Sequence, residues 1–191
     1  MRKIISREEE ERKRKGSQLL VGGILILVMV LSVLGYSLGS QEEEKTEKVN
    51  YGGFSFLKQN GFWILDLENL KFYFEYNPNE VEKIGGVLNP LKNYLDKPVY
   101  IYSENSEAEA EIYKNLFYYN QIVERMQNAC PEEEKCDESW PVKTCENNFV
   151  ILRESNETGI KQEGNCVFID GKREDLVELS DVFLYKIIGI Q

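Results

Sequence analysis

One long apolar run near the N-terminus dominates the pattern of hydrophobic and polar positions along this chain. Residues 16–41 contain no charged side chain, and thirteen of the twenty residues at 19–38 are Leu, Ile or Val. At a rise of about 1.5 Å per residue, a helix of about 20 residues spans about 30 Å, the thickness of a bilayer core. The pattern therefore predicts a transmembrane helix over residues 18–38, with the lipid bilayer as its partner.

The residues on either side of this run predict its orientation. Seven Lys and Arg side chains precede it, and the acidic segment 41–45 follows it. Basic flanks are retained in the cytoplasm, which predicts a cytoplasmic tail at residues 1–17 and an extracytoplasmic location for the C-terminal part. A cleavable secretory signal ending at Ser37-x-Gly39 is the alternative. Signal h-regions usually span only about 7–15 residues, so we favour an uncleaved single-pass signal-anchor in the cell membrane.

Beyond a polar linker expected at residues 39–52, the periodicity indicates one α/β domain over residues 53–191. The turn residues Asn60-Gly61 indicate a β-hairpin whose second strand spans 62–67. Further strands are expected at 70–76, 98–103, 148–153 and 165–169, and helices at 79–95, 106–129 and 173–188. The capping box Ser106–Glu109 is expected to open the second of these helices. Strands that alternate with helices predict a mixed sheet with flanking helices.

Two resemblances accompany this pattern. The order of elements resembles the thioredoxin-like fold with an extra N-terminal β-hairpin. That family carries C-x-x-C at the start of its first helix, where this chain has Asn77-Pro78-Asn79-Glu80, so the resemblance implies a fold without oxidoreductase activity. Phrases within the last fifty residues (Pro141–Cys145, Gly164–Ile169 and Asp181–Gly189) are similar to uncharacterised single-pass membrane proteins of archaea, which implies a membrane location and no activity.

Charge and composition narrow the classes of function. Residues 1–17 hold seven basic and four acidic groups (net +3), and residues 18–191 hold sixteen basic and twenty-nine acidic groups (net −13). Nucleic-acid binding needs a cationic face, so we expect no nucleic-acid partner. The sequence contains no histidine, which excludes Ser-His-Asp and Cys-His catalysis and histidine-ligated metals. We expect no cofactor.

All four cysteines, Cys130, Cys136, Cys145 and Cys166, lie on the expected outer side, where disulfides form. Of the three possible pairings we prefer Cys130–Cys136 with Cys145–Cys166. A zinc site built from all four is the alternative. Structural zinc ligands usually come in pairs about two to four residues apart, whereas here the gaps are five, eight and twenty residues. Asn156-Glu157-Thr158 is a sequon, which makes Asn156 a glycosylation candidate.

Three functions remain open. The anchor, the lack of histidine and the lack of a Gly-rich phosphate loop favour a non-enzymatic extracytoplasmic domain that binds another protein or joins an envelope assembly. A carboxylate- or cation-dependent enzyme is the first alternative, since Glu132–Glu138 contains five acidic residues in seven positions. A pilin-like subunit is the second, because Lys15-Gly16 before the apolar run resembles the processing site of type IV pilin-like precursors.

Intact-mass measurement and N-terminal sequencing of the full-length protein test these expectations. An uncleaved anchor leaves Met1 at the N-terminus, whereas pilin-like processing leaves Ser17 and secretory cleavage leaves a residue beyond Gly39. Two disulfides make the untreated protein lighter than the reduced protein by four hydrogen atoms. Four free thiols would contradict the expected pairing.

Overall fold

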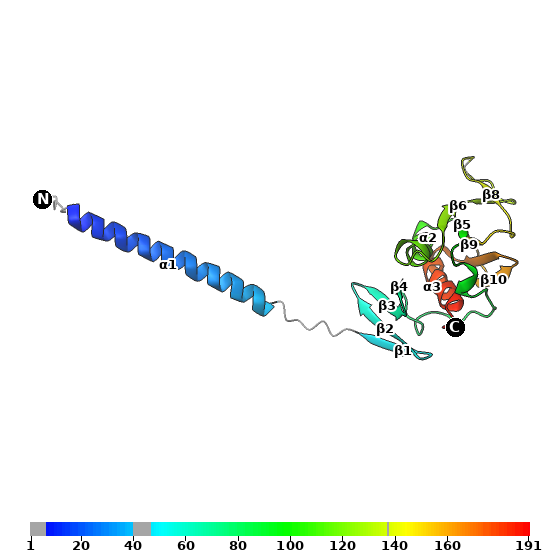
Figure 1. The fold of residues 1–191 in the computed structure, drawn as a ribbon, viewed down its shortest axis with the longest axis horizontal. Helices are drawn as coiled ribbons and strands as arrows, with labels where there is room; N and C mark the ends of the chain where they lie inside the picture. Colours follow the sequence, from blue (N-terminus) through cyan, green and yellow to red (C-terminus); the bar gives the residue numbers. More distant parts are fainter. Residues whose placement is uncertain (1–6, 40–46, 137) are drawn as a thin grey trace. The chain divides into compact units, whose positions relative to one another are not determined.

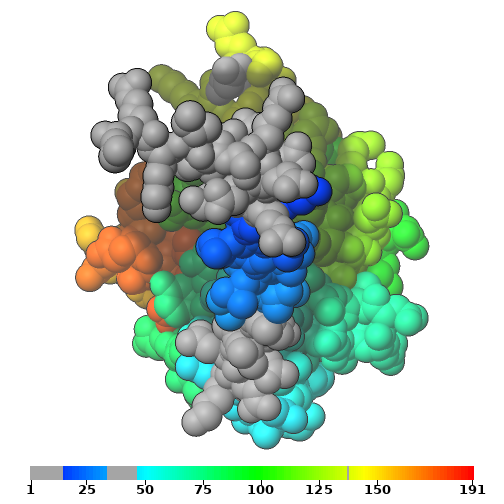
Figure 2. Space-filling view, turned by 90° about the vertical axis from the view of Figure 1, so that its left-hand side faces the viewer, coloured from blue at the N-terminus to red at the C-terminus, as the bar shows by residue number. Residues whose placement is uncertain are grey.

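The structure is a computed structural model that describes residues 7–39, 47–136 and 138–191 in two units, residues 1–45 and 46–191 (Figure 1). In the first unit, α1 (Arg7–Gly39) is a helix of 33 residues. Its segment Lys15–Val33 has a mean hydropathy of 2.2, and none of that segment is buried (blue in Figure 2). An apolar helix long enough to cross a bilayer is thus confirmed. The helix begins before residue 18 and includes most of the expected tail, of which residues 1–6 lie outside the description.

The second unit begins with an antiparallel sheet in the order β1-β2-β3-β4, the meander. Its strands are β1 (Lys48–Tyr51), β2 (Phe54–Gln59), β3 (Phe62–Leu67) and β4 (Leu70–Phe74). The expected turn joins β2 to β3, and Asn60 and Gly61 both have positive φ, 51° and 86°. β1 corrects the linker expected at residues 39–52, of which 40–46 lie outside the description. Its four residues KVNY are too few and too polar to have indicated a strand.

A mixed five-stranded sheet has the order β10-β11-β9-β5-β6. Its strands are β5 (Pro98–Ser103), β6 (Arg125–Asn128), β9 (Phe149–Glu154), β10 (Gly159–Glu163) and β11 (Cys166–Gly171). β10 is antiparallel to β11, and the other neighbours are parallel. A small parallel pair, β7 (Cys130–Pro131) and β8 (Val142–Lys143), lies between β6 and β9 along the chain. The expected mixed sheet of an α/β domain is confirmed.

Helix α3 (Leu176–Ile187) lies between the two sheets, and ten of its twelve residues are buried. A 3-10 turn, η3 (Arg173–Asp175), precedes it. On one side, the ring of Tyr185 lies 4.4 Å from that of Phe74 and 5.9 Å from that of Phe56, both in the meander. On the other side, Leu179 packs so closely on Gly171 of β11 that a Cβ there would lie 2.4 Å from the Leu179 Cδ1 atom. The main core therefore forms on both faces of α3.

The helix expected over residues 79–95 is wrong. This segment is a turn followed by an extended stretch, and its one helical turn is η1 (Leu91–Asn93). The segment covers the outer edge of β10: Asn89 donates its N–H to Gln162 Oε1 (2.6 Å), and a Cβ at Gly86 would lie 3.0 Å from the Ile160 carbonyl oxygen. Gly86 has a φ of 107°, which a helix cannot contain.

The helix expected over residues 106–129 is too long. The helix α2 (Ser106–Tyr113) continues as a π-helical turn, η2 (Lys114–Tyr118), and residues 125–128 form β6 instead. Gln121, with a φ of 48°, reverses the chain between them. The N-cap is Asn105 rather than Ser106, because the Asn105 side chain accepts the first free N–H groups of α2. The loss of one helix and the gain of strands change the element order on which the thioredoxin-like resemblance was based.

Side chains occupy the outer edge of β4, where a further strand would otherwise pair. Asn115 Oδ1 accepts from the Tyr73 N–H (2.8 Å), and Asn115 Nδ2 donates to the Tyr73 carbonyl (2.7 Å). Asn120 makes the same two bonds with Lys71, at 2.8 and 3.0 Å. Alternate residues of an edge strand direct their backbone groups outward, so these two amides replace a strand and attach η2 to the meander.

Replacing Asn115 with Ala should lower the free energy of unfolding by roughly 2–4 kcal/mol, because it leaves part-buried backbone groups without partners. Asn120→Ala, at the more exposed end of the edge, should cost roughly 1 kcal/mol. Urea unfolding of the full-length protein in detergent, followed through tryptophan fluorescence, to which the buried Trp63 (3 % exposed) contributes, measures both. Equal costs would contradict this account of the edge.

Candidate functional site

The candidate site lies on the face of the five-stranded sheet turned away from α3. Successive side chains of a strand point to opposite faces. Val150 and Leu152 of β9 accordingly belong to the main core, whereas Phe149 and Ile151 belong to a second cluster. That second cluster consists of Tyr100, Ala129, Phe149, Ile151 and Cys166, with the part-buried Tyr102 and Phe168 against it. Both faces of this sheet are therefore covered.

The segment between β6 and β9 covers this second face, and two disulfides hold it. Cys130 is bonded to Cys136, and Cys145 to Cys166. This is the pairing that we preferred, and because all four cysteines are bonded no thiolate is left for the zinc alternative. The first bond closes a short loop that carries Glu132, Glu133 and Glu134, and we call residues 130–136 the acidic loop. The second joins the end of the segment to β11.

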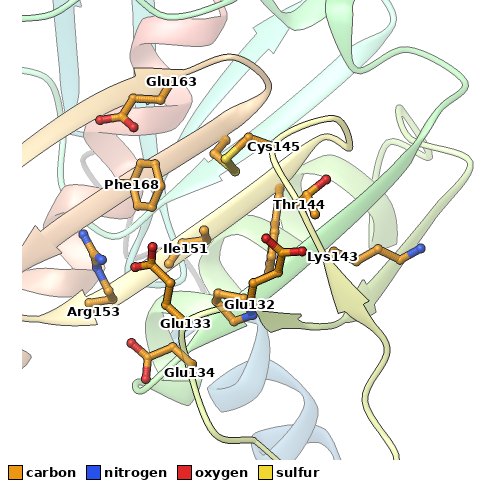
Figure 3. Close-up of a pocket in the computed structure, with 13 residues that line it drawn as sticks. Glu132, Glu133, Glu134, Lys143, Thr144, Cys145, Ile151, Arg153, Glu163 and Phe168 are labelled. Atoms are coloured by element: carbon orange, nitrogen blue, oxygen red, sulfur yellow. A yellow bond between two sulfur atoms is a disulfide. The ribbon is translucent and has the colours of Figure 1, made fainter.

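A pocket of about 210 Å³ lies between the acidic loop and the sheet (Figure 3). Its floor is formed by Phe149, Ile151 and Phe168. Glu132, Glu133 and Glu134 follow one another along the loop in front of this floor, and Glu163 of β10 stands at the other side of Phe168. The remaining lining residues are Pro131, Lys143, Thr144, Cys145, Arg153 and Cys166. The lining holds four carboxylates against one Lys and one Arg. Glu163 is paired with Lys161 at 3.3 Å, which leaves the three carboxylates of the acidic loop.

Both cations of the pocket already have partners within the domain. Arg153 donates from Nε and Nη2 to Asp170, at 2.8 and 3.1 Å, and these bonds raise the pKa of Arg153. Its guanidinium also lies 5.0 Å from the centre of the Phe168 ring. The Lys143 ammonium lies 4.4 Å from the Tyr100 ring. Residues of the five-stranded sheet therefore position both cationic groups. The carboxylates of the acidic loop lie at the mouth of the pocket.

An apolar floor beneath carboxylates suits one kind of ligand group. A Lys or Arg side chain combines an alkyl stem that packs on aromatic rings with a cationic head that pairs with carboxylates. Among the described residues, no three His, Cys, Asp or Glu side chains are grouped so that they could hold a metal ion. Of the five acids that suggested a cation site, three line the pocket, Glu138 is not part of its lining, and Asp137 lies outside the description.

The glycosylation candidate lies elsewhere. Asn156 is exposed in the turn between β9 and β10, and such a turn is accessible to a modifying enzyme. The strands expected at 148–153 and 165–169 lie on either side of it, whereas β10, directly after this turn, was not predicted. The modification itself stays a prediction.

The sequence patterns predicted β9 and β11, which carry the pocket floor, but they predicted neither β7, β8 and β10 nor the pocket itself. The run Phe149–Leu152 is apolar at every position and buried throughout, which is typical of a strand covered on both faces. This continuous apolar run was the feature of the sequence that could have indicated a cover on the second face of the sheet. The acidic residues suggested a cation site rather than one side of a pocket, because nothing in their own sequence shows that the loop folds back onto the sheet.

The two disulfides should differ in their contribution to stability. Replacing Cys145 and Cys166 together with Ala should lower the free energy of unfolding by about 3 kcal/mol, and replacing Cys130 and Cys136 by about 2 kcal/mol, because chain entropy rises with the length of the closed loop. The sequence separations are 21 and 6 residues. Urea unfolding of the two double variants without reductant measures this, and the reverse order would contradict it.

No family model, curated protein or solved structure matches this chain. The two resemblances described above therefore stay predictions.

Proposed function

We propose that this chain is a single-pass, membrane-anchored protein whose extracytoplasmic domain binds a protein partner through the pocket under the acidic loop. The observation that carries the proposal is the pocket itself. It has an apolar floor, three carboxylates on a disulfide-closed loop, and cations already paired within the domain. A cationic side chain of a partner fits these surroundings.

The proposed location is supported by three features. The apolar segment of α1 is long enough to span a bilayer. The basic residues before it indicate a cytoplasmic N-terminus. The length of the apolar segment favours an uncleaved signal-anchor over a cleavable signal. Both disulfides belong to the second unit, and disulfides persist on the oxidising side of a membrane.

The charge of the chain supports a partner with a cationic segment. Residues 18–191 carry sixteen basic and twenty-nine acidic groups, so the domain attracts a positively charged partner over about 10 Å at moderate salt. The carboxylates at the pocket mouth then select the side chain that enters. A thioredoxin-like arrangement of the sheet stays an interpretation. It implies no oxidoreductase activity, because the chain has no C-x-x-C pair: its bonded cysteines are 6 and 21 residues apart.

Photo-crosslinking of the full-length protein in its native membranes tests the proposal. A photoreactive residue at position 133 should give an adduct with a protein. The same residue at position 107, exposed on α2, is the control and should not give that adduct. Glu132→Gln with Glu134→Gln should reduce the yield at position 133 several-fold, and 0.5 M salt should do the same.

An identical adduct at positions 107 and 133, or a yield that does not change when the two carboxylates are neutralised, would overturn the proposal. Turnover of a substrate that requires these carboxylates would favour the enzyme alternative instead.

A further inference from the structure

Two carboxyl groups meet in the core where α2 lies against α3. Glu111 of α2 is 2 % exposed and Asp181 of α3 is fully buried. Asp181 Oδ2 accepts from the backbone N–H of Glu75 (3.0 Å) and of Tyr76 (2.9 Å), directly after β4. Glu111 Oε2 is paired with the Lys114 ammonium at the start of η2. One oxygen of each carboxyl group is thereby satisfied.

The second oxygen of each group has no ordinary donor. Glu111 Oε1 and Asp181 Oδ1 are the two buried side-chain oxygens, among the described residues, that receive no hydrogen bond from a protein N–H or O–H group. The two side chains are also hydrogen-bonding neighbours of each other. Two neighbouring carboxylates that are both ionised repel each other strongly in an apolar core. A proton held between them removes the repulsion and satisfies both oxygens at once.

We propose that Glu111 and Asp181 form a proton-binding site, and that one shared proton is a structural component of this domain that fastens α3 to α2 and to the segment directly after β4. The proton belongs mainly to Asp181. Glu111 has the Lys114 ammonium as its counter-charge, whereas Asp181 has only backbone N–H donors on its other oxygen.

The surroundings of the pair agree with this assignment. Burial raises the pKa of both carboxyl groups, and the negative charge of Glu111 raises that of Asp181 further. Lys114 lowers the pKa of both, although burial outweighs it. The other titratable groups that act on the pair or its neighbouring tyrosines are Glu75, Tyr76, Glu80, Asp175, Glu178 and Tyr185. All of these are carboxyl or phenol groups, so they disfavour a second negative charge at the pair.

The proton makes stability depend on pH in a defined direction. An unfolded chain releases this proton above a pH of about 4, whereas the folded pair keeps it to higher pH. The stabilisation is therefore complete in acid and is lost as the pH rises through the raised pKa of the pair. For one proton, the unfolding equilibrium constant rises about tenfold per pH unit within that interval.

The composition of this chain makes that slope easy to assign. Histidine is absent and all four cysteines are bonded. No other side chain therefore has an ordinary pKa between about 5.5 and 8. In most proteins, histidines would obscure a carboxyl group that titrates in this range.

Asp181→Asn provides the test, because an amide imitates the protonated acid. Its Oδ1 can accept from Glu75 and Tyr76, and its Nδ2 can donate to Glu111 Oε1. We expect the unfolding constant of the full-length protein, in a detergent without carboxyl groups, to rise about tenfold per pH unit above pH 5.5 and to be nearly constant in this variant. Asp170→Asn removes a carboxylate paired with Arg153 on the sheet and should keep the slope of the unaltered protein.

Infrared spectroscopy of the unaltered protein at pH 7 gives an independent result that does not depend on how a variant folds. A carbonyl band of a protonated carboxylic acid is expected, and it should disappear in Asp181→Asn and in Glu111→Gln. Absence of this band from the unaltered protein, or equal slopes in that protein and Asp181→Asn, would overturn the proposal.

Discussion

A helix that is covered on both sides must satisfy its polar groups without water, and α3 is in that position between the meander and the five-stranded sheet. The single Ser180 hydroxyl proton lies within hydrogen-bond distance of two core carbonyls, those of Leu176 (Oγ–O 2.9 Å) and Ala108 (3.2 Å). Asp181 accepts hydrogen bonds from the backbone N–H groups of Glu75 and Tyr76, directly after β4. These two neighbouring residues bind α3 to α2 and to the meander. Hydrophobic packing alone would leave the order and rotation of these layers poorly specified.

The same principle explains one edge of each sheet, β4 in the meander and β10 in the five-stranded sheet. Amide side chains complete the edge of β4, and the extended segment before β5 covers the edge of β10. Neither edge is left open to pair with another chain, which edge strands otherwise invite. The second face of the five-stranded sheet is covered by a loop that two disulfides hold in place, since that loop has little regular structure of its own. The pocket forms where the loop and the sheet do not fill the space between them.

Local patterns predicted the apolar helix, the first hairpin, most strands of the larger sheet, α3 and the pairing of the cysteines. Each of these depends on residues close together in sequence, such as the Asn60-Gly61 turn or the alternation in β4. The errors at 79–95 and 125–128 have another cause. The extended segment around Gly86 is stabilised by β10, more than seventy residues later along the chain, and β6 forms only because β5 accepts it as a neighbour. Contacts between segments that are far apart along the chain produce no hydrophobic periodicity that could predict them. The pocket and the carboxyl pair are formed entirely by such contacts.

The covalent closure of the acidic loop has a consequence for the timing of recognition. A newly made chain still in the reducing cytoplasm has neither Cys130–Cys136 nor Cys145–Cys166, so the wall of the pocket is not yet fixed. In a chain exported as we propose, the site matures only after the domain has left the compartment of its synthesis. Closure of the acidic loop would then separate the place of synthesis from the place of recognition.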